Sequence, residues 1–298
     1  MSTHTNPPSP FPLTPLLSTD AAPGVYDSLV DQTRRAVHDA GFSHTLIGLS
    51  GGIDSALTAT IAVDALGAAH VHAALMPSAI SSPGSLRDAA EVARRLGIAT
   101  HTLPIAALLD AFTTTLNPVF DDASTPIADI TVENLQARIR GVLLMALSNQ
   151  FDWFVLATGN RSEVLTGYAT LYGDMVGSFA PLAPLLKTWV WQLASLRNAR
   201  ARAAGQSAPI PDAVITKAPS AELSVGQTDA AALGDYADLD AVLYQVTVLG
   251  TSPDDLPSLG FDAAYVTATL DRMRSTQFKR DMACPGATLA LPREVFHE

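Results

Sequence analysis

The segment best suited to chemistry is a glycine-rich run that follows a short apolar stretch. It consists of Gly48, Leu49, Ser50, Gly51, Gly52, Ile53, Asp54 and Ser55. Paired glycines let the backbone approach a ligand closely, and free N–H groups at a helix N-terminus attract an anion. The run lacks the Gly-Lys-Ser/Thr of a Walker A loop and the Gly-x-Gly-x-x-Gly of a dinucleotide fingerprint. It therefore predicts a phosphate-binding loop of another kind.

Asp54 determines what kind of phosphate site this run can form. A carboxylate in the first turn of a helix gains ~0.3 to 1 kcal/mol from the helix dipole, which is a purely structural explanation. A phosphate about 4 Å away would repel it by ~4 kcal/mol at an effective dielectric near 20. Because the repulsion is larger, a bound phosphate requires a cation between the two groups. Mg²⁺ binds phosphate oxygens together with one or two carboxylates, so Asp54 is a candidate magnesium ligand.

The elements that must position this loop alternate between strand and helix. The apolar pattern predicts strands over 45–49, 70–76, 98–103 and 153–157, and helices over about 24–40, 54–66, 85–96, 131–150 and 186–204. Such alternation is typical of an α/β fold with a parallel sheet and helices on both faces. Ligands of these sheets bind at the carboxyl ends of the strands. After a loop over 205–220, the pattern predicts a mainly helical C-terminal part.

The helix predicted over 131–150 carries two stripes. Leu135, Ile139, Val142, Leu143, Ala146 and Leu147 recur at helical spacing and predict one buried face. Asn134 and Arg138 lie four residues apart and share a polar stripe beside it. From the residues alone, this stripe is either a solvated face or a binding surface.

The chain reads as one domain over 23–298 behind a short tail. Residues 1–22 are rich in Pro, Ser and Thr and predict a disordered segment, with packed structure beginning near Val25. The Ser-rich loop 77–84 follows the second strand, and we expect it to act as a lid over the site.

Composition limits the partners. The chain has 18 Lys plus Arg against 29 Asp plus Glu, a formal charge of -11 that disfavours nucleic acids and anionic membranes. One cysteine, Cys284, excludes an intrachain disulfide and a cysteine-rich zinc site. The sequence has no signal-peptide pattern and no stretch of 18 apolar residues, so we expect a cytoplasmic protein.

The run Ser-Gly-Gly-x-Asp-Ser resembles the PP-loop of the N-type ATP pyrophosphatases, which cleave ATP between its α and β phosphates. Segments 133–140, 157–163, 167–174, 219–223 and 278–280 follow in an order and spacing similar to NAD synthetases. The likeness extends from about residue 25 to the C-terminus. It implies the adenine-nucleotide α-hydrolase-like, Rossmann-like fold of that family.

The resemblance assigns roles to residues as follows. ATP would contact the PP-loop (residues 48–55), Thr158, Lys187 and Ser220. Deamido-NAD would contact Asn134, Arg138, Glu163, Tyr168, Asp174 and Lys279, with Arg138 donated across a homodimer interface. Asp54 and Glu163 would hold Mg²⁺, and Asp54, Glu163 and Lys187 would form the catalytic set. Local explanations compete with three of these roles: a helix cap at Asn160-x-x-Glu163, a snorkelling Lys187, and an ordinary surface turn over 167–178.

The implied reaction is ATP-dependent amidation of deamido-NAD through an NAD-adenylate, which releases AMP and pyrophosphate. Leu171 and Ser178 differ from the lysine and aspartate common in ammonia-using enzymes, so this chain looks more like the synthetase half of a glutamine-dependent enzyme. Only a short tail precedes that half, so the expected nitrogen donor is ammonia, free or from a separately encoded glutaminase. The alternatives are a portion of a longer glutamine-dependent enzyme and, more remotely, a non-catalytic nucleotide sensor. A tRNA-modifying enzyme is disfavoured because the chain is acidic and has no cysteine pair.

Overall fold

A parallel β-sheet forms the centre of the protein. The computed structural model describes residues 16–122, 127–220, 222–224 and 228–289. Within these residues the strands are β1 (His44–Gly48), β2 (Val71–Leu75), β3 (Ala99–Thr102) and β4 (Trp153–Leu156). They pair in the order β3-β2-β1-β4, all in parallel. The predicted parallel α/β sheet is confirmed, with strand ends shifted by one residue.

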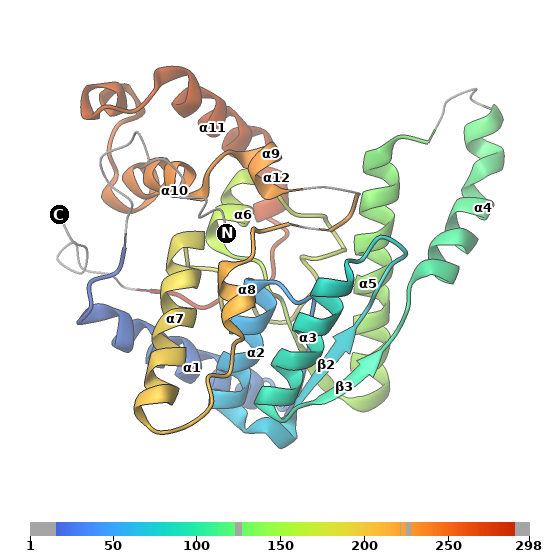
Figure 1. The fold of residues 1–298 in the computed structure, drawn as a ribbon. Coiled ribbons are helices and arrows are strands. Elements are labelled where there is room, and N and C mark those ends of the chain that lie inside the picture. The colour runs from blue at the N-terminus through green and yellow to red at the C-terminus, as the bar shows by residue number, and fades with distance from the viewer. Residues whose placement is uncertain (1–15, 123–126, 221, 225–227, 290–298) are drawn as a thin grey trace, which may run out of the picture.

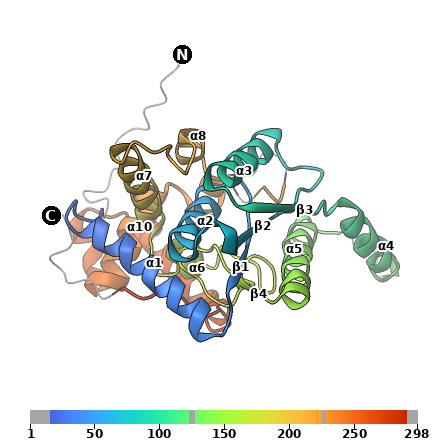
Figure 2. The same ribbon diagram turned by 90° about the horizontal axis from the view of Figure 1, so that it is seen from below.

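Alternation along the strands divides the core between the two faces of the sheet. Ile47 and Leu156 point into the larger apolar cluster, whereas Leu46 and Val155 belong to a smaller one. The larger cluster is covered by α1 (Ala21–Asp39), α2 (Ile53–Leu66), α3 (Pro83–Leu96) and α7 (Lys187–Ala203), and the smaller by α5 (Asp129–Phe151). Figure 2 shows α2 and α5 on opposite sides of the strands. Helices on both faces are therefore confirmed.

The buried face predicted for α5 is only partly correct. Ile139 is buried, but Val142 and Ala146 are exposed, while Gln136 and Leu144 are buried instead. The reason is that α5 is apolar on more than one side, so periodicity cannot select the face that meets the sheet. One apolar face of α5 is left uncovered by the elements of the described residues.

A helical group lies at the end of the sheet where the strands finish. It consists of α6 (Arg161–Thr166), α9 (Asp229–Leu233), α10 (Tyr236–Tyr244), α11 (Ala263–Ser275) and α12 (Gln277–Arg280). Short π and 3-10 segments, Gln245–Leu249 and Pro253–Leu259, join α10 to α11. Figure 1 shows this group together at the top of the molecule, and α10, α11 and α12 all contact α6.

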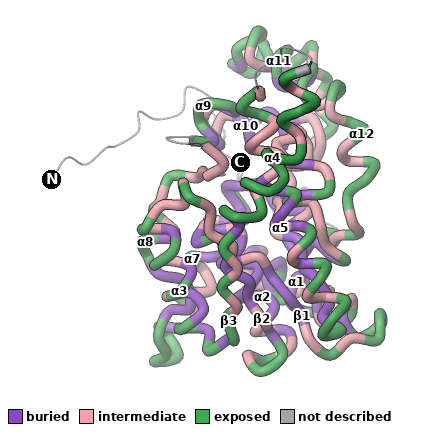
Figure 3. Tube along the Cα trace, turned by 90° about the vertical axis from the view of Figure 1, so that its right-hand side faces the viewer, coloured by how far each residue is buried: buried purple, intermediate pink, exposed green. Residues whose placement is uncertain are grey.

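Some elements were not predicted or begin elsewhere. Helix α4 (Ala106–Asp122) was missed, and α8 (Asp212–Thr216) interrupts the predicted loop 205–220. Packing begins before Val25, because Leu17 is buried and exchanges two backbone hydrogen bonds with the Gln192 side chain. Most of the predicted disordered tail lies outside the described residues. In Figure 3 strand β2 and α2 are largely buried, whereas β3, α4 and α11 are largely exposed.

None of the helices in the described part of the chain has both the length and the apolar character needed to cross a bilayer.

Candidate functional site

The PP-loop connects the carboxyl end of β1 to the first turn of α2. Gly51 has φ +84°, and a Cβ there would collide with the backbone carbonyl of Ser85. Glycine is therefore required at this position both for conformation and for space. The Ser55 hydroxyl accepts the backbone N–H of Ser50 at 3.2 Å, and the Ser50 hydroxyl accepts that of Gly52 at 3.2 Å. The loop is thus shaped by its own serines at a helix N-terminus, where an anion is favoured.

A second loop meets the PP-loop from β4, the neighbouring strand. Asn160 caps α6 in a complete capping box with Glu163, which confirms the predicted cap. The same Asn160 side chain donates to Asp54 Oδ1 at 2.8 Å. Since β1 and β4 are adjacent and parallel, their carboxyl ends bring the two carboxylates into one site.

Lys187, the first residue of α7, places its ammonium between these two carboxylates. Its Nζ lies 2.5 Å from Asp54 Oδ2 and 3.2 Å from Glu163 Oε1. The lysine side chain is 2% exposed and the two carboxylates are 18% exposed. The predicted alternative of a snorkelling lysine is therefore wrong, because the charged end is the part that is most firmly held.

Asp54, Glu163 and Lys187 form a triad of charged side chains, and the charge of each depends on the other two. Burial raises the pKa of Glu163 above its ordinary value, and the Lys187 charge offsets part of that effect. Burial opposes the charged form of Lys187, but the carboxylates of Asp54 and Glu163 outweigh it and raise the lysine pKa. When both carboxylates are ionised, they outnumber the one ammonium, and the site can accept a further cation.

The donor set of the triad fits magnesium bound beside a nucleotide. Among the described residues, no three His, Cys, Asp or Glu side chains are arranged to hold a metal by themselves. Asp54 and Glu163 can nevertheless reach one cation together, because the Lys187 ammonium already contacts both. Mg²⁺ commonly takes one or two carboxylates and completes its shell with phosphate oxygens and water.

A second group of predicted residues gathers where α5 meets the loop 167–174. The Thr170 hydroxyl donates to Asn134 Oδ1 at 2.8 Å, and the Thr170 backbone N–H donates to Asp174 Oδ1 at 2.8 Å. Arg138 is exposed and donates from Nε to the Leu171 carbonyl at 3.2 Å. The polar stripe of α5 is thus adjacent to this loop, and Arg138 is exposed beside it.

Tyr168 lies in this loop, and Lys279 contacts the loop from outside. From α12, Lys279 Nζ donates to the carbonyls of Gly167 and Ala169 at 2.8 and 2.7 Å. It therefore binds the loop backbone. The Tyr168 hydroxyl is buried, and burial, followed by the nearby Asp229 carboxylate, raises its pKa.

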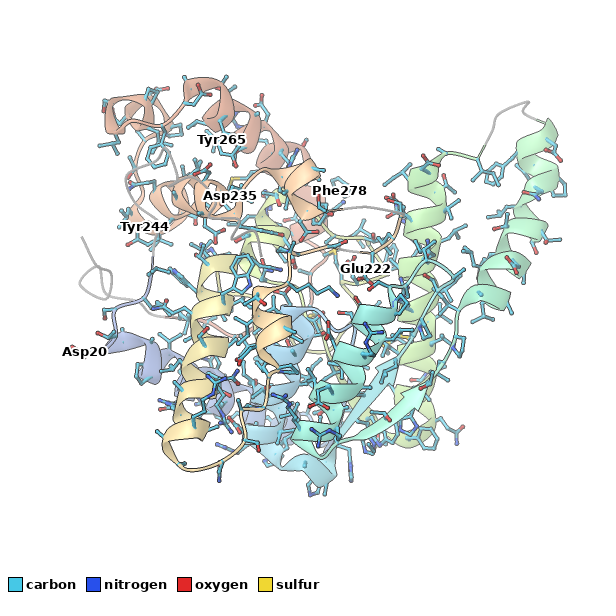
Figure 4. All side chains as sticks on the ribbon, in the orientation of Figure 1. Asp20, Glu222, Asp235, Tyr244, Tyr265 and Phe278 are labelled. Atoms are coloured by element: carbon cyan, nitrogen blue, oxygen red, sulfur yellow. The ribbon has the colours of Figure 1, made fainter. Side chains whose placement is uncertain are left out.

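A third contact joins the segment after α8 to the N-terminus of α3. Glu222 Oε1 accepts hydrogen bonds from the hydroxyls of Ser82, at 3.2 Å, and Ser85, and Lys217 Nζ lies 3.4 Å from the same oxygen. Figure 4 shows Glu222 near the upper end of α3. The loop predicted over 77–84 is therefore tied to the segment that carries Ser220, and it ends at Ser82, the cap of α3. Thr158 lies two residues after β4, partly exposed.

Sequence reasoning missed three buried polar residues around the triad: Asp229, Tyr236 and Asp240. The Tyr236 hydroxyl donates to Asp229 Oδ2 at 3.0 Å, and the Tyr236 ring lies 5.2 Å from Lys187 Nζ. Asp240 accepts hydrogen bonds from Ser162 and Thr188. The available signal was an aspartate between apolar neighbours on a buried helix, which requires polar partners.

Comparison with known proteins shows which family this chain resembles. The NAD synthase family model matches residues 25–283. The glutamine-dependent NAD(+) synthetase of Acinetobacter baylyi is 44% identical over 93% of this chain and 50% of its own length. The structure of the Acinetobacter baumannii glutamine-dependent enzyme in complex with ADP aligns over 89% of this chain and 46% of that one, with 41% identity and a TM-score of 0.62.

A shorter relative aligns over nearly its full length. The NH3-dependent NAD synthetase of Campylobacter jejuni is 28% identical, covers 87% of this chain and 95% of its own, and has a TM-score of 0.69. By contrast, this chain spans about half the length of the curated relatives it matches. The chain belongs to the NAD synthase family, because the family model matches it along most of its length, including the PP-loop and Glu163.

Proposed function

We propose that this chain is a cytoplasmic ligase that converts deamido-NAD to NAD with ATP. The nicotinate carboxylate attacks the α phosphorus of ATP, which forms an NAD-adenylate and releases pyrophosphate. Ammonia then attacks the activated carbonyl and displaces AMP, which leaves the amide. The observation that supports this proposal most strongly is the Lys187 ammonium held between Asp54 and Glu163 next to the PP-loop.

The proposed roles follow from charge and position. Adenylation needs little covalent help from the protein, so catalysis consists of orienting the carboxylate and neutralising the leaving pyrophosphate. The PP-loop (residues 48–55) binds the pyrophosphate, and Lys187 supplies positive charge beside it. Thr158 and Ser220 contact the nucleotide. A magnesium ion on Asp54 and Glu163 would supply further charge neutralisation between these carboxylates and the phosphates.

Deamido-NAD is proposed to bind between α5 and the loop 167–174. Asn134, Arg138, Tyr168 and Asp174 provide its polar contacts. Lys279 acts through the loop carbonyls that it holds. Glu163 lies between the two substrates, because α6 begins at the triad and ends at this loop. The enzyme is proposed to work as a homodimer in which Arg138 reaches the site of the partner subunit.

The proposed nitrogen donor is ammonia, either free or supplied by a separately encoded glutaminase. The similarity to an NH3-dependent enzyme over nearly the full length of that relative supports this choice. The alternative is that the chain acts as the synthetase portion of a glutamine-dependent enzyme, which its more similar relatives support. A nucleotide sensor without turnover is the remaining alternative.

One assay distinguishes turnover with ammonia, turnover with glutamine and nucleotide binding without turnover. The purified chain is incubated with deamido-NAD, ATP and Mg²⁺, with either ammonium or glutamine, and NAD and pyrophosphate are measured. NAD formation with ammonium but not glutamine is the expected result. Glutamine turnover equal to that with ammonium would overturn the ammonia assignment. ATP binding with no pyrophosphate release under any condition would instead identify a sensor.

A further inference from the structure

Asp240 is a buried carboxylate that none of the roles above uses. It lies on α10 with no exposed surface, beneath the triad. Its Oδ1 accepts the Ser162 hydroxyl at 2.5 Å, and its Oδ2 accepts the backbone N–H of Thr188 at 2.7 Å. The Ser162 hydroxyl in turn accepts the backbone N–H of Lys187 at 3.0 Å. One carboxylate therefore connects two other helices.

The two helices are joined at the positions that matter for the triad. Ser162 directly precedes Glu163 in the first turn of α6, and Thr188 directly follows Lys187 in the first turn of α7. N–H groups in the first turn of a helix have no partner within the helix and need an external acceptor. Asp240 supplies that acceptor for α7, directly to Thr188 and through Ser162 to Lys187.

The position of Lys187 depends on where α7 begins. Ser162 and Asp240 accept two of the backbone N–H groups there, next to the Arg161 N–H that donates to the Leu185 carbonyl at 2.8 Å. The N-cap of α7, Leu186, provides no side-chain hydrogen bond, so Asp240 on α10 and Ser162 on α6 perform this role. A shift of the first turn of α7 would move the ammonium away from Asp54 and Glu163. Misplacement of a charged group by about 1 Å can reduce a rate by about 10²-fold.

We propose that Asp240 is a positioning residue that sets the register of Glu163 and Lys187 by tying the first turns of α6 and α7 together. This inference rests on the proposed function, because it assigns the triad to the phosphates of ATP. Asp240 itself contacts no substrate in this proposal. Its effect should appear in the affinity for ATP and in the adenylation step, and it should operate through Lys187.

The matched control is Asp64, which also binds α7 but far from the triad. Its carboxylate accepts hydrogen bonds from Arg197 at 2.6 and 3.0 Å and from the Tyr26 hydroxyl at 2.7 Å. Asp64→Asn should lower stability without moving the first turn of α7. Comparing it with changes at Asp240 separates a general loss of stability from a loss of register.

The experiment measures ATP binding in the presence of Mg²⁺ by isothermal titration calorimetry, together with pyrophosphate release in the presence of deamido-NAD. Asp240→Ala should weaken ATP binding by about tenfold with unchanged stoichiometry, and lower kcat for pyrophosphate release by about tenfold or more. Asp240→Asn keeps one acceptor for Thr188 and should fall between Asp240→Ala and the wild type. Asp64→Asn should match the wild type in both quantities.

Two measurements distinguish a positioning role from a purely structural one: the number of ATP sites per chain, and the effect of Asp240→Ala in a Lys187→Met background. If Asp240 only supports folding, Asp240→Ala lowers the number of binding sites per chain and leaves the affinity of the folded fraction unchanged, which would overturn the proposal. In a Lys187→Met background, Asp240→Ala should cause no further loss of ATP affinity, since both changes act on one unit. Additive losses would equally overturn it.

Failure of the proposed function gives a different result. A wild-type chain that binds ATP but releases no pyrophosphate rejects the ligase assignment, and the affinities of the variants still test Asp240. A wild-type chain that does not bind ATP rejects both proposals.

Discussion

The lysines of this chain lie around the site proposed for the nucleotides, although the chain carries a formal charge of -11. Only Lys187, Lys217 and Lys279 occur in the sequence. Each lies beside one of the segments around the site: Lys187 in the triad, Lys217 at Glu222, and Lys279 on the loop carbonyls of Gly167 and Ala169. All three lysines of a chain with a net charge of -11 are thus placed beside segments of the proposed site.

Removing the lysine of the triad should destabilise the folded protein. Lys187→Met leaves two neighbouring carboxylates without their cation, and breaking a buried ion pair costs about 3 to 5 kcal/mol. We expect a loss near the lower limit, because Asp54 and Glu163 retain some exposure to water. Urea unfolding of Lys187→Met, and of Lys187→Met combined with Glu163→Gln, measures the effect. The second change should restore part of the stability, and a single variant as stable as the wild type would contradict the ion-pair argument.

Asp54 should be essential for adenylation. Asp54→Ala removes one of the two carboxylates proposed to hold magnesium and a partner of both Lys187 and Asn160. Pyrophosphate release should fall by about 10²-fold or more, comparable to removal of one preorganised electrostatic group from an active site. Asp271→Ala, which changes an exposed carboxylate on α11, is the control and should retain full activity. Pyrophosphate release at the wild-type rate from Asp54→Ala would refute the role in metal binding.

At the scale of elements, the amino ends of the strands carry a cluster of histidines on the side opposite to the site. His44 Nδ1 lies 3.1 Å from His72 Nε2, and the ring of His72 stacks on Trp153 with centroids 3.7 Å apart. Burial, followed by the charges of His44, His101 and His70, lowers the pKa of His72 below 6.5. The folded protein therefore resists a proton that the unfolded chain accepts.

This cluster predicts a stability that falls in weak acid. Below pH 6.5 the unfolded chain binds more protons than the folded protein at His72, so the free energy of unfolding decreases as the pH falls. The melting temperature should drop between pH 7.5 and 5.5, and it should drop less in His72→Phe, which keeps a ring against Trp153. His38→Asn, an exposed histidine on α1, should follow the wild type. Equal slopes for His72→Phe and the wild type would disprove the assignment.

The sequence predicted those elements whose pattern is locally complete. Strands with continuous apolar runs and the capping box at Asn160 were identified because their signals lie within a few residues. Helix α4 was missed, and the buried face of α5 was partly wrong, because both helices expose apolar side chains such as Phe112 and Val142. Asp240 was missed because its partners, Ser162 and Thr188, are distant in sequence and are brought together only by folding.

At the scale of the whole molecule, α4 and α5 expose several large apolar side chains that no other described element covers. These are Leu108, Phe112, Val119, Ile130, Val142, Met145 and Phe151. Apolar patches of this kind commonly mark interfaces between proteins. Arg138 is exposed on the same helix, which supports the proposal that a second copy of the chain covers this face.

Val142→Glu should then shift the protein toward a monomer in light scattering coupled to size-exclusion chromatography, whereas His38→Asn should leave the mass unchanged.

Mixing two inactive variants tests whether Arg138 acts in the partner's site. In a dimer of one Arg138→Ala subunit and one Asp54→Ala subunit, the first site combines its own Asp54 with Arg138 of the partner subunit, while the second site lacks both. Because a symmetric dimer assembles at random after unfolding and refolding together, about half of the dimers are mixed and about a quarter of all sites become competent. NAD formation should therefore recover to about a quarter of the wild-type rate in the co-refolded mixture, and not when the variants are refolded separately and assayed together at once. No recovery on co-refolding, with dimers present by light scattering, would place Arg138 in the site of its own subunit.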